Sequence, residues 1–78
     1  MSHKVYVEVT ATFTPDGLVR PLSVHWQDGT VYTVDRVLDI RRAAATKAGG
    51  CGLRYTCRIQ GQQTHLFFDE DKWFVEVH

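Results

Sequence analysis

Basic residues gather in one segment of the chain, "RVLDIRRAAATKAGGCGLRYTCR" at residues 36–58. The segment holds six of the nine Lys/Arg residues and one of the nine acids, a formal charge of +5 within a chain of net charge zero. The six are Arg36, Arg41, Arg42, Lys47, Arg54 and Arg58. Five are arginines, whose planar guanidinium groups donate paired hydrogen bonds to phosphate or carboxylate. The segment is therefore a candidate binding site for a polyanion.

The spacing of Arg54 and Arg58 predicts that both side chains lie on one face of a strand. Residues 53–60, "LRYTCRIQ", alternate apolar and polar side chains, which is typical of a half-buried strand. Both arginines then face solvent, and the preceding hairpin arm brings the other basic residues alongside. The alternative is a solvated surface balanced by weak cross-strand ion pairs. The acids available for such pairs are Glu8, Asp35, Asp39 and Glu76.

Aromatic rings decide whether such a surface also contacts bases, because proteins that bind single strands combine a basic groove with stacking rings. The alternation of the sequence predicts exposed rings at Tyr6, Tyr32 and Phe67. Most rings of a small barrel are needed inside it. The rings expected in the core are those of Phe13, Trp26 and Trp73.

Cysteine and histidine residues offer the other candidate chemistry. His25, Cys51, Cys57 and His65 have the ligand types of a zinc site, but the close C-x-x-C pair of such sites is absent. Cys51 is near Arg54 and is the one candidate nucleophile, yet no nucleophile motif surrounds it. Cys57 alternates with apolar neighbours, as a small buried hydrophobic residue does. We therefore predict no catalytic residue, no metal site and no cofactor.

The elements that position the basic segment begin with a hairpin. Residues 4–13 alternate apolar and polar side chains, and "TPDG" at 14–17 has the Pro and Gly positions of a type I turn. The return strand, residues 18–26, contains Pro21, which restricts it to a sheet edge or a bulge. The Asp-Gly pair within "QDG" at 27–29 then predicts a second, two-residue hairpin turn.

The third strand is predicted from about residue 30 to about residue 40, with a bulge near residues 35–36, where the alternation slips. A loop with one helical turn near residues 41–48 is expected to follow. The alternative is a helix over residues 35–49. The residues near helical spacing are Val37, Arg41, Ala44 and Ala48.

Three further strands complete the predicted fold, at residues 53–60, 64–68 and 73–77, joined by a turn at Gly61 and Gln62 and by the acidic turn "DEDK". Short strands joined by tight turns predict one all-β domain over residues 1–78. We expect an antiparallel sheet curled into a Src-homology-3-like barrel of five to six strands, because closure removes exposed edges. A small open sheet with one helix is the alternative. The predicted core consists of Val7, Val9, Trp26, Val34, Tyr55, Ile59, Leu66 and Trp73.

Size and composition fit this fold. The 78 residues suffice for one domain, and 44% hydrophobic with 23% charged residues indicates a globular chain. No stretch approaches the roughly 18 apolar residues of a membrane span, and the first residues lack the apolar run of a secretory signal. Two cysteines are too few for a disulfide scaffold. We expect a cytoplasmic protein with reduced thiols and no membrane partner.

Three motifs carry a resemblance to known proteins: W-x-x-G-x-x-Y-x-V at residues 26–34, V-L-D-x-R at 37–41 and W-F-V at 73–75. With them, residues 20–77 resemble small uncharacterised bacterial domains of Firmicutes. They resemble more distantly an actinobacterial domain of unknown function that is associated with genes for error-prone DNA synthesis. These motifs are typical of fold determinants rather than of a catalytic signature, so the resemblance implies no ligand or reaction.

Together these features predict a non-enzymatic binding module that takes nucleic acid or another polyanion on residues 36–58. The alternative is an adaptor whose basic face docks an acidic protein, or a homodimer that pairs its own +5 and −5 regions. Both hypotheses use the same arginines. The arrangement of these arginines in the fold therefore determines which charged groups a partner contacts.

Overall fold

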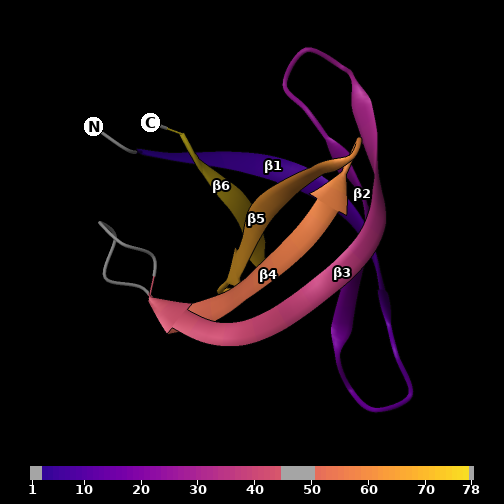
Figure 1. Ribbon diagram of the computed structural model, residues 1–78. Coiled ribbons are helices and arrows are strands. Elements are labelled where there is room, and N and C mark those ends of the chain that lie inside the picture. The colour runs from indigo at the N-terminus through magenta and orange to yellow at the C-terminus, as the bar shows by residue number, and fades with distance from the viewer. Residues whose placement is uncertain (1–2, 45–50, 78) are drawn as a thin grey trace.

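The computed structural model describes residues 3–44 and 51–77, which form six strands and no helix (Figure 1). The strands are β1 (His3–Phe13), β2 (Val19–His25), β3 (Val31–Ala44), β4 (Cys51–Ile59), β5 (Gln62–Asp69) and β6 (Lys72–Val77). They close into an antiparallel barrel in chain order, with β6 paired to β1. The prediction of a small closed all-β barrel is confirmed, and the alternative of an open sheet with a helix is wrong. The described residues include no helix of the length and apolar character needed to cross a membrane.

Two long strands, β1 and β3, are each shared between two parts of the barrel. Residues 3–7 of β1 pair with β6, and residues 8–13 pair with β2. Likewise, residues 31–33 of β3 pair with β2, and residues 34–44 pair with β4. Both strands therefore bend around the barrel (Figure 1), and the second part of β3 forms a long ribbon with β4.

Two bulges set the bend of β3. The register with β4 shifts between Val34 and Arg36 and again between Val37 and Asp39. The first shift confirms the bulge predicted from the slip in alternation. Because each bulge inserts one residue, Val34, Val37 and Ile40 all pack against the core although they are three apart. A doubly bulged strand therefore has the apolar spacing of a helix.

The strand β3 continues to Ala44, past its predicted end near residue 40. The helical turn predicted near residues 41–48 is therefore wrong for residues 41–44, and residues 45–48 lie outside the described part of the chain. The alternative helix over residues 35–49 is wrong as far as Ala44 for the same reason. Pairing with β4 supplies these residues with backbone hydrogen-bond partners that a helix would otherwise provide.

The first two turns share one geometry. In the β1–β2 turn the amide of Gly17 donates to the carbonyl of Thr14 at 2.9 Å, which confirms a tight turn at residues 14–17. In the β2–β3 turn the amide of Gly29 donates to the carbonyl of Trp26 at 3.0 Å, and Gly29 has a φ of 90°. The amide of Trp26 also donates to the carbonyl of Thr30, so this loop holds three residues rather than the predicted two.

The next turn, between β4 and β5, consists of Gln60 and Gly61. Their φ angles of 51° and 74° are typical of a two-residue hairpin. Ile59 pairs with Gln62 on either side of it. The turn therefore lies one residue earlier than predicted, and this shift places Gln62 within β5.

The core fills the closed part of the barrel. Its buried residues are Val24, Tyr55, Cys57, Leu66 and Trp73. Of the predicted core, Val7, Val9, Val34 and Ile59 pack against this cluster, whereas Trp26 is half-exposed at one mouth.

Phe13 is 77% exposed, so its predicted place in the core is wrong. It lies near the tip of the β1–β2 hairpin, which extends past the closed part of the barrel (Figure 1). Strand alternation predicts the face on which a side chain lies. It does not predict whether another strand covers that face.

Candidate functional site

Four of the predicted arginines form two cross-strand pairs on the β3–β4 ribbon. Arg36 lies directly opposite Arg58, and Arg41 lies directly opposite Arg54. All four side chains lie outside the barrel, because the residues that alternate with Arg54 and Arg58 on β4 are buried in the core. The register therefore places like charges at neighbouring positions twice, an arrangement that destabilises a sheet.

The two arginine pairs are separated along β4 by about 13 Å, the rise of four strand residues. Thr56 lies between them, opposite Asp39, and is only 9% exposed. Arg36, Arg41 and Arg58 are exposed, whereas Arg54 is half-buried. The site is thus a narrow outer ribbon with a cationic pair at each end.

Acidic residues neutralise little of this charge within the described part of the chain. The carboxylate of Asp39 accepts a hydrogen bond from Nε of Arg41 at 2.6 Å, on the same strand. Both side chains are exposed, so this ion pair contributes little to stability. The described residues contain no other salt bridge, so Glu8, Asp35 and Glu76 form none of the expected ion pairs with the described arginines.

Among the described residues, the polar contact of Arg58 is with the backbone, and one atom of Arg54 has no polar partner. Nη1 of Arg58 donates to the carbonyl of Gly61 at 3.4 Å, which holds its guanidinium over the β4–β5 turn. Nε of Arg54 is buried and has no hydrogen-bond partner among the described residues. The exposed side chains of Arg36, Arg41 and Arg58 are thus the ones whose guanidinium groups a ligand reaches most directly.

Two residues of the predicted site do not join this arrangement. Arg42 lies opposite Leu53, which packs against the core, so Arg42 belongs to the other face of the ribbon. Lys47 lies outside the described residues. The structure therefore brings together Arg36, Arg41, Arg54 and Arg58 from the six predicted residues.

An aromatic row continues the Arg41–Arg54 pair across the outside of the barrel. In register, Arg54 lies opposite Phe67, and Phe67 lies opposite Phe74. Phe74 in turn lies opposite Tyr6. The rings of Phe67 and Phe74 stack with centroids 5.1 Å apart, and Tyr6 meets Phe74 edge-on at 5.7 Å. Phe67 and Phe74 form an apolar cluster separate from the core.

Of the three rings predicted to be exposed, one is exposed and two are not. Tyr6 is 52% exposed, as predicted, whereas Phe67 is only 7% exposed and Phe74 only 1%. Phe67 and Phe74 are therefore both covered, in part by each other, and Tyr6 is the ring of the row that remains exposed to a ligand. Tyr32, the third predicted ring, is half-buried at one mouth of the barrel.

Two lysines outside the basic segment flank the aromatic row. Nζ of Lys4 lies 4.5 Å from the ring centroid of Phe74, and Nζ of Lys72 lies 5.9 Å from that of Tyr6. Both distances suit cation–π attraction. The positive face therefore extends beyond residues 36–58, although the sequence shows these lysines far from the arginines.

Pairs of adjacent aromatic residues in the sequence indicate the aromatic row. Two aromatic doublets, Phe67-Phe68 and Trp73-Phe74, each place one ring inside the barrel and the other outside, because successive strand residues face opposite ways. Phe68 and Trp73 contact each other inside, with centroids 4.7 Å apart. A doublet of large rings in a strand thus indicates an apolar group on the outer face.

Of the zinc candidates, the described side chains of His25, Cys57 and His65 do not gather at one point. Cys57 points into the barrel and is fully buried, whereas His65 is exposed and lies opposite Thr56 on the outer face. Burial raises the pKa of the Cys57 thiol to about 11, which disfavours the thiolate that nucleophilic attack and metal binding require. The described residues contain no group of three His, Cys, Asp or Glu side chains suited to a metal ion.

A disulfide between Cys51 and Cys57 is excluded by the strand that carries both. Cys51 begins β4, and its side chain lies outside the described residues, but its backbone is six residues from Cys57 along the strand. Six residues of a strand span about 20 Å, whereas the Cα atoms of a disulfide lie within about 7 Å.

Comparisons with protein-family models, with curated proteins and with solved structures find no match to this chain. The resemblance drawn from the three motifs stays a prediction. The candidate site consists of two arginine pairs, one aromatic row and two flanking lysines.

Proposed function

We propose that the chain is a non-enzymatic module that binds nucleic acid on the outer face of β3 and β4. The observation that carries the proposal is the register that sets Arg36 against Arg58 and Arg41 against Arg54. A phosphate between the two guanidinium groups of a pair lowers their mutual repulsion and accepts hydrogen bonds from both. Anion binding therefore offsets a cost that the free protein carries.

The separation of the two pairs supports a ligand with repeated negative charge. The pairs lie about 13 Å apart along β4, so one small anion contacts a single pair. A nucleic-acid backbone passes both pairs and gains both sets of contacts. Such binding releases counterions and is therefore steeply salt-dependent.

The aromatic row supports a single strand over a duplex. Tyr6 stands at its far end, 52% exposed, between the two lysines. Unpaired bases stack on exposed rings, whereas bases inside a duplex do not present their faces. We therefore propose that a strand runs from the arginine pairs toward Tyr6.

Fluorescence anisotropy with a labelled single-stranded oligonucleotide tests the proposal. Arg36→Gln combined with Arg58→Gln is expected to lower the affinity about tenfold or more, the effect of losing one charge-assisted contact. The log–log slope of affinity against salt is expected to decrease by about 1 for each lost phosphate contact. The matched control is Arg20→Glu on β2. Arg20 is exposed, and this single substitution lowers the net charge by two units, as the double variant does. It is expected to retain the affinity within about twofold.

Other outcomes contradict the proposal in different ways. An equal loss in both variants shows attraction by total charge without a site. Absence of binding to single strands at low ionic strength contradicts the function itself. In that case, an acidic protein captured by the native chain but not by the Arg36/Arg58 variant indicates the adaptor. A dimer in sedimentation equilibrium that the same variant abolishes indicates pairing between copies of the chain.

A further inference from the structure

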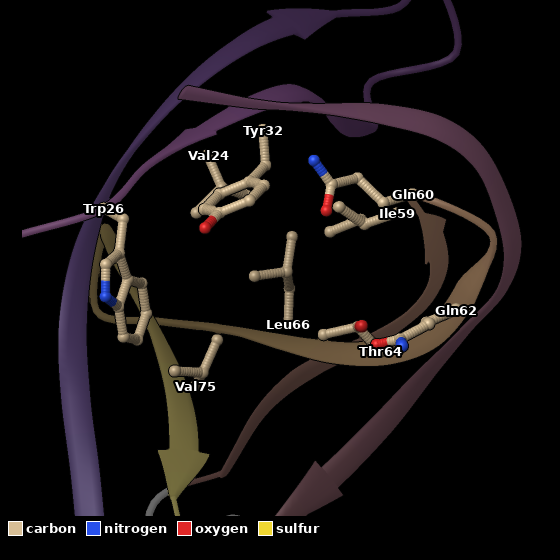
Figure 2. A pocket seen from close by; sticks show the side chains of 9 residues that line it. All are labelled: Val24, Trp26, Tyr32, Ile59, Gln60, Gln62, Thr64, Leu66 and Val75. Carbon is tan, nitrogen blue, oxygen red and sulfur yellow. The ribbon is translucent and has the colours of Figure 1, made fainter. Parts of the chain in front are cut away.

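One mouth of the barrel opens into a cavity of about 330 Å³ (Figure 2). Leu66 and Val24, both buried, form part of an apolar floor. Trp26 lies on one side of the cavity in Figure 2, and the hydroxyl of Tyr32 points into the shared space. The described residues that line the cavity carry no charge. Its polar side-chain groups are the hydroxyls of Tyr32 and Thr64, the indole N–H of Trp26 and the amides of Gln60 and Gln62.

The lining defines the chemical class of the occupant. The volume is at the lower end of the range for small-molecule sites, which suits one ring system rather than an extended molecule. A charged group entering an uncharged cavity loses hydration without gaining a partner. The indole of Trp26 offers a stacking face, and the amides of Gln60 and Gln62 offer both donors and acceptors. These features together suit an uncharged planar heterocycle with a hydrogen-bonding edge, which is the chemistry of a nucleobase.

The cavity and the basic ribbon meet at the β4–β5 turn. Gln60 of this turn lines the cavity, and the carbonyl of Gly61 accepts the hydrogen bond from Nη1 of Arg58 on the outer side. Arg36 lies opposite Arg58. A cationic pair for a phosphate and an uncharged cavity for a base therefore stand on the two sides of one short turn.

We propose that this mouth binds one unpaired nucleobase of a strand whose backbone lies on Arg36 and Arg58. The inference rests on the proposed function and adds a base site to it. A base held in a duplex cannot enter the cavity, so the site also selects single strands. The bound strand then has two separate base-binding positions, one at Tyr6 and one in the cavity at the mouth.

Two oligonucleotides of equal length and charge test the base site. One is an ordinary single strand and the other carries abasic positions throughout, so both offer the same phosphates. The native protein is expected to bind the ordinary strand at least about tenfold more tightly, because the abasic strand offers no base to the mouth or to Tyr6. Gln62→Ala is expected to reduce this preference, and Gln63→Ala is expected to keep it. Gln62 lines the cavity, whereas its neighbour Gln63 pairs with Arg58 on the outer face.

Nuclear magnetic resonance gives a second measurement on the native chain. Titration with the ordinary strand is expected to shift the indole resonance of Trp26 and the amide resonances of Gln62. The indole of Trp73, buried in the core, is expected to stay in place. Trp26→Phe assigns the two indole signals.

The outcomes separate this inference from the proposed function. If the native protein binds both strands with equal affinity, and the Arg36→Gln, Arg58→Gln variant loses affinity for both, the base site is wrong and the basic interface is retained. Binding of neither strand overturns both proposals. A free nucleoside that shifts the Trp26 indole as strongly as the strand does, at the same concentration, overturns the assignment to a strand and indicates a free small molecule instead.

Discussion

Tyr55 of β4 donates its hydroxyl hydrogen to the backbone carbonyl of Val19 in β2. The amide of Thr14 bonds to the carbonyl of Leu18, so the next carbonyl along, that of Val19, faces away from β1. On that side β2 pairs with β3 only at residues 23–25. A fully buried side chain thus replaces a ladder bond that the barrel lacks at this point.

Tyr55→Phe is expected to lower the free energy of unfolding by about 1–2 kcal/mol, because the ring still fills its place while the carbonyl loses its donor. Urea unfolding followed by circular dichroism measures the change. Tyr6→Phe is the matched control, since Tyr6 is exposed, and is expected to change stability by less than about 0.5 kcal/mol. Equal effects in both variants would show that the bond to Val19 adds nothing.

Stability is expected to fall at alkaline pH. Burial raises the pKa of Cys57 from its ordinary value of 9.0 to about 11, and burial followed by repulsion from Cys57 raises the pKa of Tyr55 above 10.0. Above pH 9.0 the unfolded thiol ionises while the folded thiol stays protonated, so the unfolded state is progressively stabilised relative to the folded state until about pH 11. The stability associated with the protonated Cys57 thiol is fully present below pH 9.0 and is lost as the pH rises toward about 11.

Urea midpoints measured from neutral pH to about pH 11 check this decline. In the Cys57→Ala variant the decline in stability is expected to begin at a higher pH, nearer the ordinary tyrosine pKa of 10.0. This shift is expected whatever effect the substitution has on stability at neutral pH. Tyr6→Phe is expected to leave the profile in place. A flat profile in the native protein would contradict the burial of both groups.

Gly52→Ala is expected to destabilise the barrel by about 1–3 kcal/mol, the usual range for overpacking. A Cβ at this position would lie 2.5 Å from the carbonyl oxygen of Phe68 and 2.9 Å from Cβ of Asp69. The first of these is backbone, so the strand itself has to shift. Thermal unfolding measures the loss, with Gly61→Asn as the control, because asparagine tolerates the positive φ of that turn. Unchanged stability in Gly52→Ala would mean that β4 and β5 separate more easily than their register implies.

Arg36→Gln is expected to stabilise the free protein while it weakens nucleic-acid binding. Removing one charge from the Arg36–Arg58 pair relieves repulsion of about 0.2–1 kcal/mol at low ionic strength. Salt screens this gain, so the two proteins are expected to unfold at the same temperature near 1 M salt, where the Debye length is about 3 Å. Arg20→Gln, at a position whose cross-strand partner is Thr12 rather than an arginine, is expected to give no gain. Destabilisation by Arg36→Gln would show that the pair is not repulsive.

Local patterns were enough to predict the barrel. Alternation located most of the strand residues, and Pro-Asp-Gly and Asp-Gly located the first two turns, because these features depend on a few adjacent residues. The end of β3 was missed because its two bulges give Val34, Val37 and Ile40 the spacing of a helix. Only the pairing with β4 distinguishes a doubly bulged strand from a helix at these residues.

The candidate site was predictable in part. The charge count located the basic segment, and alternation placed Arg54 and Arg58 on one outer face. The cross-strand pairs were not predictable, because they depend on how many bulges precede each residue. Lys4 and Lys72 were missed because they come from the two ends of the chain, which only barrel closure brings together.

Closure of the barrel has a consequence for how the chain folds. Five of the six strand pairings join consecutive strands, whereas the pairing of β1 with β6 joins opposite ends of the sequence. Hairpins between consecutive strands form quickly, and the last pairing requires the entropy of closing nearly the whole chain into a loop. Trp73 in the core and Val75 in the cavity both belong to β6. Core and cavity are therefore expected to be completed in the same late, slow step, so a chain whose β1–β6 seam opens loses the base site before its hairpins unfold.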